Sequence, residues 1–320
     1  MYLARLLTIG LVAGALVLAS APETPAAYPD KPITIIVPFG AGGAYGRLGR
    51  KMGADLEKKL GVPVVVKNNP GAGGRKGAVV LFKSKPDGYT IGFVHFISFQ
   101  SNEILRGKKA SIDYNRFKII LKLTDAKQFV YVNKKSPIKS LADLKKAGRA
   151  IKFATTGVGA VTWVEANALG ATLGFPVKFV TGYKNLPKAA LAVARGDAEA
   201  GAGGYVHVRN VLDDLRMLAF IADKKDPNLP DVPTTTELGY PQLSVLGVPR
   251  IVGAPPGTPD DRLQVIRKAM REIVADAAFK EWALKGGFFL NPEGPDATWK
   301  VLKANAEIMH GLKPLLTKKK

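Results

Sequence analysis

The hydrophobic and polar positions of the chain follow two periods, one typical of strands and one typical of helices. Short runs rich in β-branched residues at 33–37 and 62–66 predict two strands. Between them, apolar residues spaced four apart predict a helix over 47–60. Its stripe consists of Leu48, Met52, Leu56 and Leu60. A further run at 90–94 predicts a third strand, and this alternation predicts a parallel sheet with helices on both faces.

The same alternation returns in the second half of the chain. Predicted strands lie at 129–132, 151–154, 177–180 and 217–222, with a further apolar run near 246–252. A helix opens after the glycines at 157–159, and we expect it to run to Leu169 and to stop at Gly170. Another helix follows, with Thr258 as its cap and Pro259 in its first turn.

Two similar units predict an α/β fold with two lobes, in which two βα sandwich domains are joined by two crossover strands and hinge about them. We assign 28–124 to the N-terminal part of lobe 1 and 125–249 to lobe 2. The segment 250–320 is too short for a domain, so we expect it to return and pack on lobe 1.

The segment 1–27 has the layout of a secretory signal peptide. Arg5 precedes an apolar run over 6–19, and small and proline residues follow. This run is shorter than the roughly 20 residues that a membrane-spanning helix needs. We expect export to the periplasm with cleavage near Ala26 or Ala27, and a membrane anchor is the alternative.

The composition excludes several kinds of site. The chain has no cysteine, which excludes a lipid anchor on cysteine, disulfides and thiolate metal sites. Its formal net charge is +21, and residues 28–124 hold 17 basic and 6 acidic residues. Such a charge favours anionic partners. We expect no nucleic acid among them, because the chain is predicted to be exported and has no basic stripe interleaved with aromatic residues.

Two glycine-rich loops carry the candidate chemistry. Residues 38–46 (PFGAGGAYG) and 155–160 (TTGVGA) each link a predicted strand to a predicted helix. Free backbone N–H groups and the helix dipole favour an anion at such a position, and glycines allow it to come close. Two corresponding loops in two lobes predict a clamp on one negative group. Two ordinary tight turns are the alternative.

An enzyme is the competing interpretation of the same glycines. Gly40, Gly42 and Gly46 form a loose relative of the dinucleotide fingerprint, but the next strand ends in lysine and asparagines where that site wants an acidic residue. His95, His207 and His310 are scattered and show no metal-ligand spacing. We therefore expect no catalytic residues, no metal and no cofactor.

Several motifs together resemble a known family. In order they are YPDKPI at 28–33, PFGAGG at 38–43, NNPGAGG at 68–74, PDGYT at 86–90, GVG at 157–159, LPDVPT at 229–234 and APPGTP at 254–259. They are similar to motifs of the tripartite tricarboxylate transporter substrate-binding proteins, the Bug family. The resemblance covers essentially all of 28–320.

The resemblance implies a non-catalytic periplasmic solute-binding protein with the type II-like two-lobed fold. Such a protein captures a small organic acid and delivers it to membrane transporter subunits by transient contact. We expect a monomer, and a receptor that signals to a sensor kinase is the alternative role. The implied ligand-binding residues are Phe39, Gly40, Ala41, Gly42, Gly43, Ala44, Tyr45, Gly46, His95, Ser98, Thr156, Gly157, Val158, Gly159, Ala160 and Tyr183.

The chain departs from the family pattern at several positions, among them the family's usual Glu-Asn-Arg-Pro, which here is KNNP at 67–70. Gly46 stands where the family commonly has aspartate, Ala160 where it has serine, and Trp163 where it has histidine. Loss of the aspartate removes a counter-charge for an ammonium group, which makes an amino acid a less suitable ligand. Tyr45 could stack on an aromatic acid or stand exposed on its loop, and Trp163 could pack beneath its helix.

Overall fold

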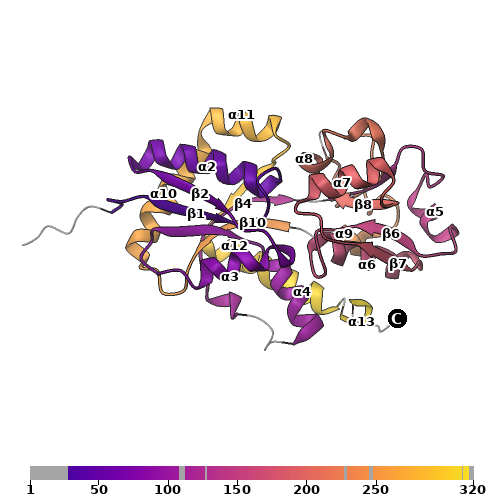
Figure 1. Ribbon diagram of the computed structural model, residues 1–320, viewed down its shortest axis with the longest axis horizontal. Coiled ribbons are helices and arrows are strands. Elements are labelled where there is room, and N and C mark those ends of the chain that lie inside the picture. The colour runs from indigo at the N-terminus through magenta and orange to yellow at the C-terminus, as the bar shows by residue number, and fades with distance from the viewer. Residues whose placement is uncertain are drawn as a thin grey trace, which may run out of the picture.

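Two α/β lobes, each built on its own sheet, lie side by side in the computed structural model (Figure 1). The structure describes residues 28–107, 112–126, 128–226, 229–244, 248–311 and 313–316. The predicted signal peptide lies outside the described residues. Among the described helices, none is both long and apolar enough to cross a membrane.

Six strands form the sheet of the first lobe. They are β1 (Ile33–Val37), β2 (Val64–Asn68), β3 (Thr90–Val94), β4 (Lys118–Ala126), β10 (Val248–Ala254) and β11 (Leu290–Glu293). Their order across the sheet is β11-β4-β10-β3-β1-β2. β1 pairs in parallel with β2 and β3, whereas β10 runs antiparallel to β3 and β4. The sheet is therefore mixed, and only its β2-β1-β3 part is parallel as predicted.

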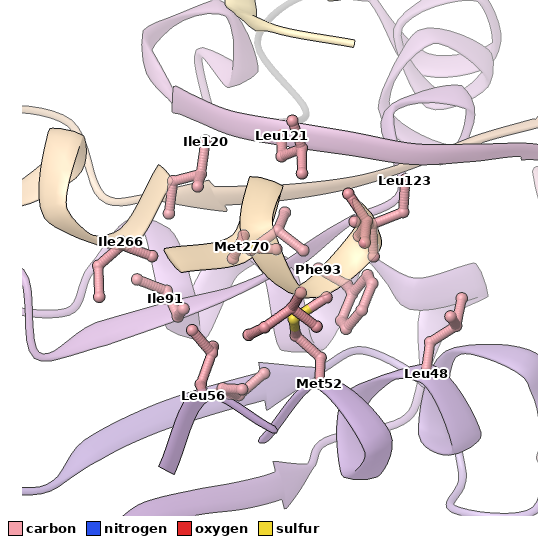
Figure 2. Packing of buried hydrophobic residues seen from close by; sticks show 14 of the residues in the cluster. Leu48, Met52, Leu56, Ile91, Phe93, Ile120, Leu121, Leu123, Ile266 and Met270 are labelled. Atoms are coloured by element: carbon pink, nitrogen blue, oxygen red, sulfur yellow. The ribbon is translucent and has the colours of Figure 1, made fainter. Parts of the chain in front are cut away.

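Helices cover both faces of this sheet. One face carries α2 (Ala44–Leu60), α10 (Asp260–Ala275) and α11 (Ala277–Lys285), and the other carries α3 (Arg75–Phe82), α4 (Phe96–Arg106) and α12 (Pro295–Gly311). Ile35 packs in the first layer and Ile36 in the second, as expected for alternate residues of a strand. Figure 2 shows the predicted stripe of α2 meeting the side chains of α10 and the sheet, through Leu48, Met52, Leu56, Ile266 and Met270.

The second lobe has a five-stranded sheet. Its strands are β5 (Gln128–Asn133), β6 (Ile151–Ala154), β7 (Val177–Val180), β8 (Ala200–Gly203) and β9 (Leu215–Ile221), in the order β7-β6-β8-β5-β9. The helices around it are α5 (Leu141–Lys146), α6 (Val161–Leu173), α7 (Leu186–Arg195), α8 (Tyr205–Val208) and α9 (Pro241–Ser244). Short 3-10 turns lie at η1 (Ala72–Gly74), η3 (Tyr114–Arg116) and η4 (Leu212–Asp214).

The chain passes twice between the sheets. It leaves the first sheet from β4 to β5 and returns from β9, through α9, to β10. Two crossings were predicted, and the lobe boundaries given above stay a prediction. The return segment packs on the first lobe but also reaches the second. Met309 of α12 lies in the apolar core of the second lobe, and α13 (Lys313–Leu316) contacts α6. Ile104 of α4, from the N-terminal part of the first lobe, lies in the same core.

Two predicted helix ends are wrong. α6 continues through Gly170 to Leu173, and Gly174 ends it with φ 78°. A Cβ at Gly170 would lie 2.6 Å from Cγ2 of Val177, so this glycine serves close helix–strand packing rather than termination. Thr258 does not cap α10, because its hydroxyl donates to the carbonyl of Pro255 at 2.8 Å.

Candidate functional site

A cavity lies between the lobes at the ends of both glycine-rich loops. The first lobe contributes Phe39, Gly43, Ala44, Tyr45, His95, Val248 and Arg250, and the second contributes Gln128, Thr156, Ala160, Val161, Asn185, Leu186 and His207. Its volume is about 30 Å³, counted as the space open to the centre of a water molecule. One water needs about 10–15 Å³ on this measure. The cavity therefore has room for two or three waters, and an organic acid needs the lobes to stand farther apart.

The first loop joins β1 to α2 and presents backbone donors to the cavity. α2 begins at Ala44 after Gly43, and no side chain caps it. Within the described chain, the N–H groups of Ala44 and Tyr45 have no hydrogen-bond acceptor. The first N–H groups of a helix carry partial positive charge, which favours an anion.

The second loop joins β6 to α6 and repeats this arrangement. Ala160 precedes the first helical residue without capping it through a side chain, and the Val161 N–H lacks an acceptor in the described part of the chain. A 2.7 Å hydrogen bond joins the hydroxyls of Thr155 and Thr162 beneath the loop. Gly159 has φ 79°, a conformation that other residues rarely adopt. Two helix starts thus share one cavity.

The two lobes touch beside these loops. Ser101 of α4 donates a 2.6 Å hydrogen bond to the carbonyl of Gly159. Asn185, which caps α7, lies over the first loop, where a Cβ at Gly40 would come within 3.3 Å of its side-chain nitrogen. A side chain at this position would make the contact tight, so that Asn185 would have to shift by a few tenths of an ångström. The structure shows the lobes in contact on both loops.

A buried histidine lies at the end of β3. His95 is 2% exposed, and its Nδ1 lies 2.5 Å from the hydroxyl of Ser98. That hydroxyl donates to the carbonyl of Gly73, so the histidine must donate at Nδ1. Burial lowers the pKa of His95 to about 4, assisted by the positive charge of Arg250. The ring is therefore neutral at pH 7, and its Nε2 is a hydrogen-bond acceptor.

A buried arginine completes the wall. Arg250 of β10 is 4% exposed, and its Nη1 donates to the hydroxyl of Thr124 at 3.0 Å. Its guanidinium lies 5.8 Å from the ring centre of Tyr45 and 5.6 Å from that of Phe288. Burial lowers its pKa from an ordinary value so high that the group stays protonated. The lining residues that the structure describes thus include one cationic side chain and no carboxylate.

Comparison with known proteins decides the family. Residues 48–302 match the family described as Tripartite tricarboxylate transporter family receptor, TctC. The chain belongs to the TctC family.

Individual relatives agree with this assignment. Protein BugT of Bordetella pertussis is 29% identical over 275 residues, a match that covers 82% of each chain. The solved structure of the periplasmic binding protein BugD has a TM-score of 0.82 at 26% identity, covering 92% of this chain and 100% of that one. MatC from Rhodopseudomonas palustris with bound malate shares the fold, with a TM-score of 0.77 at 23% identity, covering 90% of this chain and 100% of that one. TctC proteins are binding proteins, and this chain is not an enzyme.

Seven of the residues predicted for this TctC-family site line the central cavity: Phe39, Gly43, Ala44, Tyr45, His95, Thr156 and Ala160. The other predicted loop residues are not among its lining residues, and Val158 is 53% exposed. Ser98 contacts His95 from behind rather than lining the cavity. Tyr183 lies beside a neighbouring hollow of about 340 Å³ that shares Phe39 and Thr156 with the cavity. Their role as ligand contacts stays a prediction.

The structure gives a packing reason for two of the departures from the TctC pattern, those at Gly46 and Trp163. A Cβ at Gly46 would lie 2.2 Å from the carbonyl oxygen of Ala41, so this loop conformation requires glycine. Tyr45 is not exposed, since its ring stacks on Phe39 at 4.9 Å. Trp163 packs beneath its helix against Phe179 at 5.6 Å.

Arg250 and Gln128 are the polar lining residues that sequence reasoning missed, along with Asn185 and His207, which it did not assign to the site. The sequence contains a signal for Arg250, because this arginine interrupts an otherwise apolar run over 248–254. Both neighbours of this strand are central strands, so a side chain on it is buried on either face. The interpretation of Tyr45 as an exposed residue missed a buried hydroxyl in the same wall.

Proposed function

We propose that this TctC-family protein is exported to the periplasm, where it captures a small organic carboxylate between its lobes for a tripartite tricarboxylate-type transporter. The observation that carries the proposal is the pair of helix starts, of α2 and α6, that face one cavity without side-chain caps. Each offers free backbone N–H groups to a negative group. The closed lobes would then hold that group away from water.

The magnitudes agree with useful affinity. A hydrogen bond to a charged group contributes about 1.5–3 kcal/mol, and a helix terminus adds about 0.3–1 kcal/mol. Micromolar binding requires about 8 kcal/mol. Three or four such contacts, with closure of the lobes, reach that value.

Neighbours of the same fold support the ligand class. The structure of MatC contains malate, and that of another Rhodopseudomonas palustris protein contains adipate. The second has a TM-score of 0.83 at 21% identity and covers 90% of this chain and 98% of that one. Both ligands are small organic acids, which is the chemistry that the two loops favour here.

A thermal-shift screen tests the proposal. The purified mature chain is heated with small carboxylates and with the corresponding amides. A ligand at 100 times its Kd stabilises the folded state by about 2.7 kcal/mol. For a chain of this size, whose unfolding entropy is about 0.6 kcal/mol/K, we expect a rise in Tm of about 4 °C for acids. If the amides raise the Tm as much as the acids, the backbone donors do not select an anion and the proposal is wrong.

A further inference from the structure

The buried guanidinium of Arg250 has no carboxylate partner in the described structure. None of the ion pairs found among the described residues includes it, and its Nε is a buried donor without an acceptor. Its one side-chain hydrogen bond goes to a neutral hydroxyl, that of Thr124. A buried charge without a partner costs several kcal/mol, so proteins seldom keep one without a use.

The acidic residue whose charge acts on Arg250 is held by other partners. Asp125 acts on Arg250 only through its charge. Its Oδ2 accepts from Nζ of Lys122 and from Nδ2 of Asn291, each at 2.5 Å. Lys122 is also within 2.9 Å of Glu293. This carboxylate is therefore occupied by its own lysine and amide and is not the counter-ion of the arginine.

Other polar atoms without partners lie in the same wall. The hydroxyl of Tyr45 and Oε1 of Gln128 are buried and form no hydrogen bond, as is the case for Nε of Arg250. The exposed fractions of these three side chains are 7%, 1% and 4%, and all three line the cavity. They come from α2, β5 and β10, that is, from both lobes. Unpaired buried groups that converge on one cavity mark a place where a ligand completes the hydrogen bonds.

The histidines of the cavity add no charge. His95 donates at Nδ1 and so leaves Nε2 as an acceptor. His207 has the opposite arrangement, because Nδ1 accepts the N–H of Gly204 at 3.1 Å and the proton is on Nε2. Burial, with the charge of Arg250, lowers the pKa of both rings. Among the described lining residues, the arginine is thus the single cation, and a ligand ammonium would find no carboxylate among them.

We propose that Arg250 determines specificity by pairing with a second acidic group of the ligand, so that the protein selects dicarboxylates without an amino group. The first carboxylate lies at the helix starts of the two loops, as the proposed function requires, and this inference rests on that function. The second lies against the guanidinium, with the hydroxyl of Tyr45 and the amide of Gln128 beside it. Arginine suits this role because its planar donors match a carboxylate.

Titration calorimetry tests the pairing on both the ligand and the protein. The probes are the straight-chain dicarboxylates of three to eight carbons, their half-amides and their diamides. The variants are Arg250→Gln and Arg250→Lys. The matched control is Arg267→Gln, which removes another buried guanidinium, one that donates to the carbonyls of Ile119 and Ile120 under α10 and lies outside the cavity.

For the wild-type protein we expect the best dicarboxylate to bind at least 30-fold more tightly than its half-amide. Arg250→Gln should remove most of that difference, with a loss of about 30-fold or more for the diacid and less than threefold for the half-amide. Arg250→Lys should fall between, because it keeps the charge and loses the fork of donors. Arg267→Gln should lower the Tm and leave both affinities unchanged.

The outcomes separate the two proposals. Equal binding of diacid and half-amide by the wild type overturns the role of Arg250, even when both bind more tightly than the diamide, a result that leaves the proposed function intact. An equal loss of affinity for the diacid and the half-amide in Arg250→Gln also overturns the proposed role of Arg250. The arginine would then contact the carboxylate that both ligands share. Diamides that bind as tightly as diacids refute the proposed function itself. If Arg250→Gln does not fold, the wild type and Arg250→Lys still decide between these results.

Discussion

The two buried histidines should make the folded protein sensitive to mild acid. His95 has a pKa of about 4 in the folded protein and an ordinary value of 6.5 in the unfolded chain. Between these values the unfolded chain binds a proton that the folded protein does not bind. The free energy of unfolding therefore falls as the pH falls from about 6.5 to about 4, and the stability is fully present above pH 6.5.

The size of the effect follows from the two pKa values. From pH 7 to pH 5, protonation of the unfolded chain at His95 alone lowers the free energy of unfolding by about 2 kcal/mol. His207, whose pKa is also lowered by burial, adds a loss of the same sign. The carboxyl groups whose pKa values are lowered, such as Asp143 and Glu199, titrate below this window and contribute little to it.

Urea unfolding at pH 7 and pH 5 measures this loss. The wild-type loss should exceed that of His95→Gln by about 2 kcal/mol, since the variant has no imidazole to titrate at this position. His310→Gln is the matched control, because its ring is exposed and hydrogen-bonds to the carbonyl of Ala306. Its loss should equal that of the wild type. If His95→Gln loses as much stability as the wild type, the ring is not held neutral and the tautomer assigned to it is wrong.

Two further substitutions test contacts at and near the site. Ser101→Ala removes the 2.6 Å hydrogen bond to Gly159 between the lobes, worth about 1 kcal/mol, so the affinity for the best carboxylate should fall about fivefold in calorimetry. Ser84→Ala, which removes an exposed hydroxyl, should not change it, and an unchanged affinity in Ser101→Ala would show that this bond does not favour closure. Lys122→Met leaves two carboxylates without their 1%-exposed lysine and should lower the free energy of unfolding by about 2–3 kcal/mol. Lys285→Met breaks an exposed pair and should cost less than about 1 kcal/mol, and equal losses in the two variants would contradict this difference.

The layers of the fold and the position of the glycine-rich loops could be predicted from sequence because both depend on local pattern. The stripe of α2 and the run of β1 lie where the spacing of apolar residues places them. The positions of the loops could be predicted because a glycine-rich stretch between a predicted strand and a predicted helix is itself a local pattern. The prediction that Gly170 ends a helix was wrong because the deciding contact is made with the following strand and not within the helix. A glycine inside a helix and a glycine that ends one look alike, and only its contact with Val177 separates them.

The polar wall of the cavity could not be predicted in the same way. Whether Arg250 faces water or the interior depends on β3 and β4, which lie far from it in the sequence. The positions of Gln128 and His207 opposite it depend on how the second lobe meets the first. Charge counts gave no help, because the net charge of +21 comes from many lysines and the residue that matters is a single buried arginine.

The side chains of Ile104 and Met309, which belong to helices of the first lobe, are embedded in the core of the second. Pulling them out would expose apolar surface at a cost of about 1.5–3 kcal/mol for each. The lobes should therefore stay joined along the edge where α4 and α12 reach across (Figure 1). Opening and closing would then be a rotation of one lobe against the other about this edge.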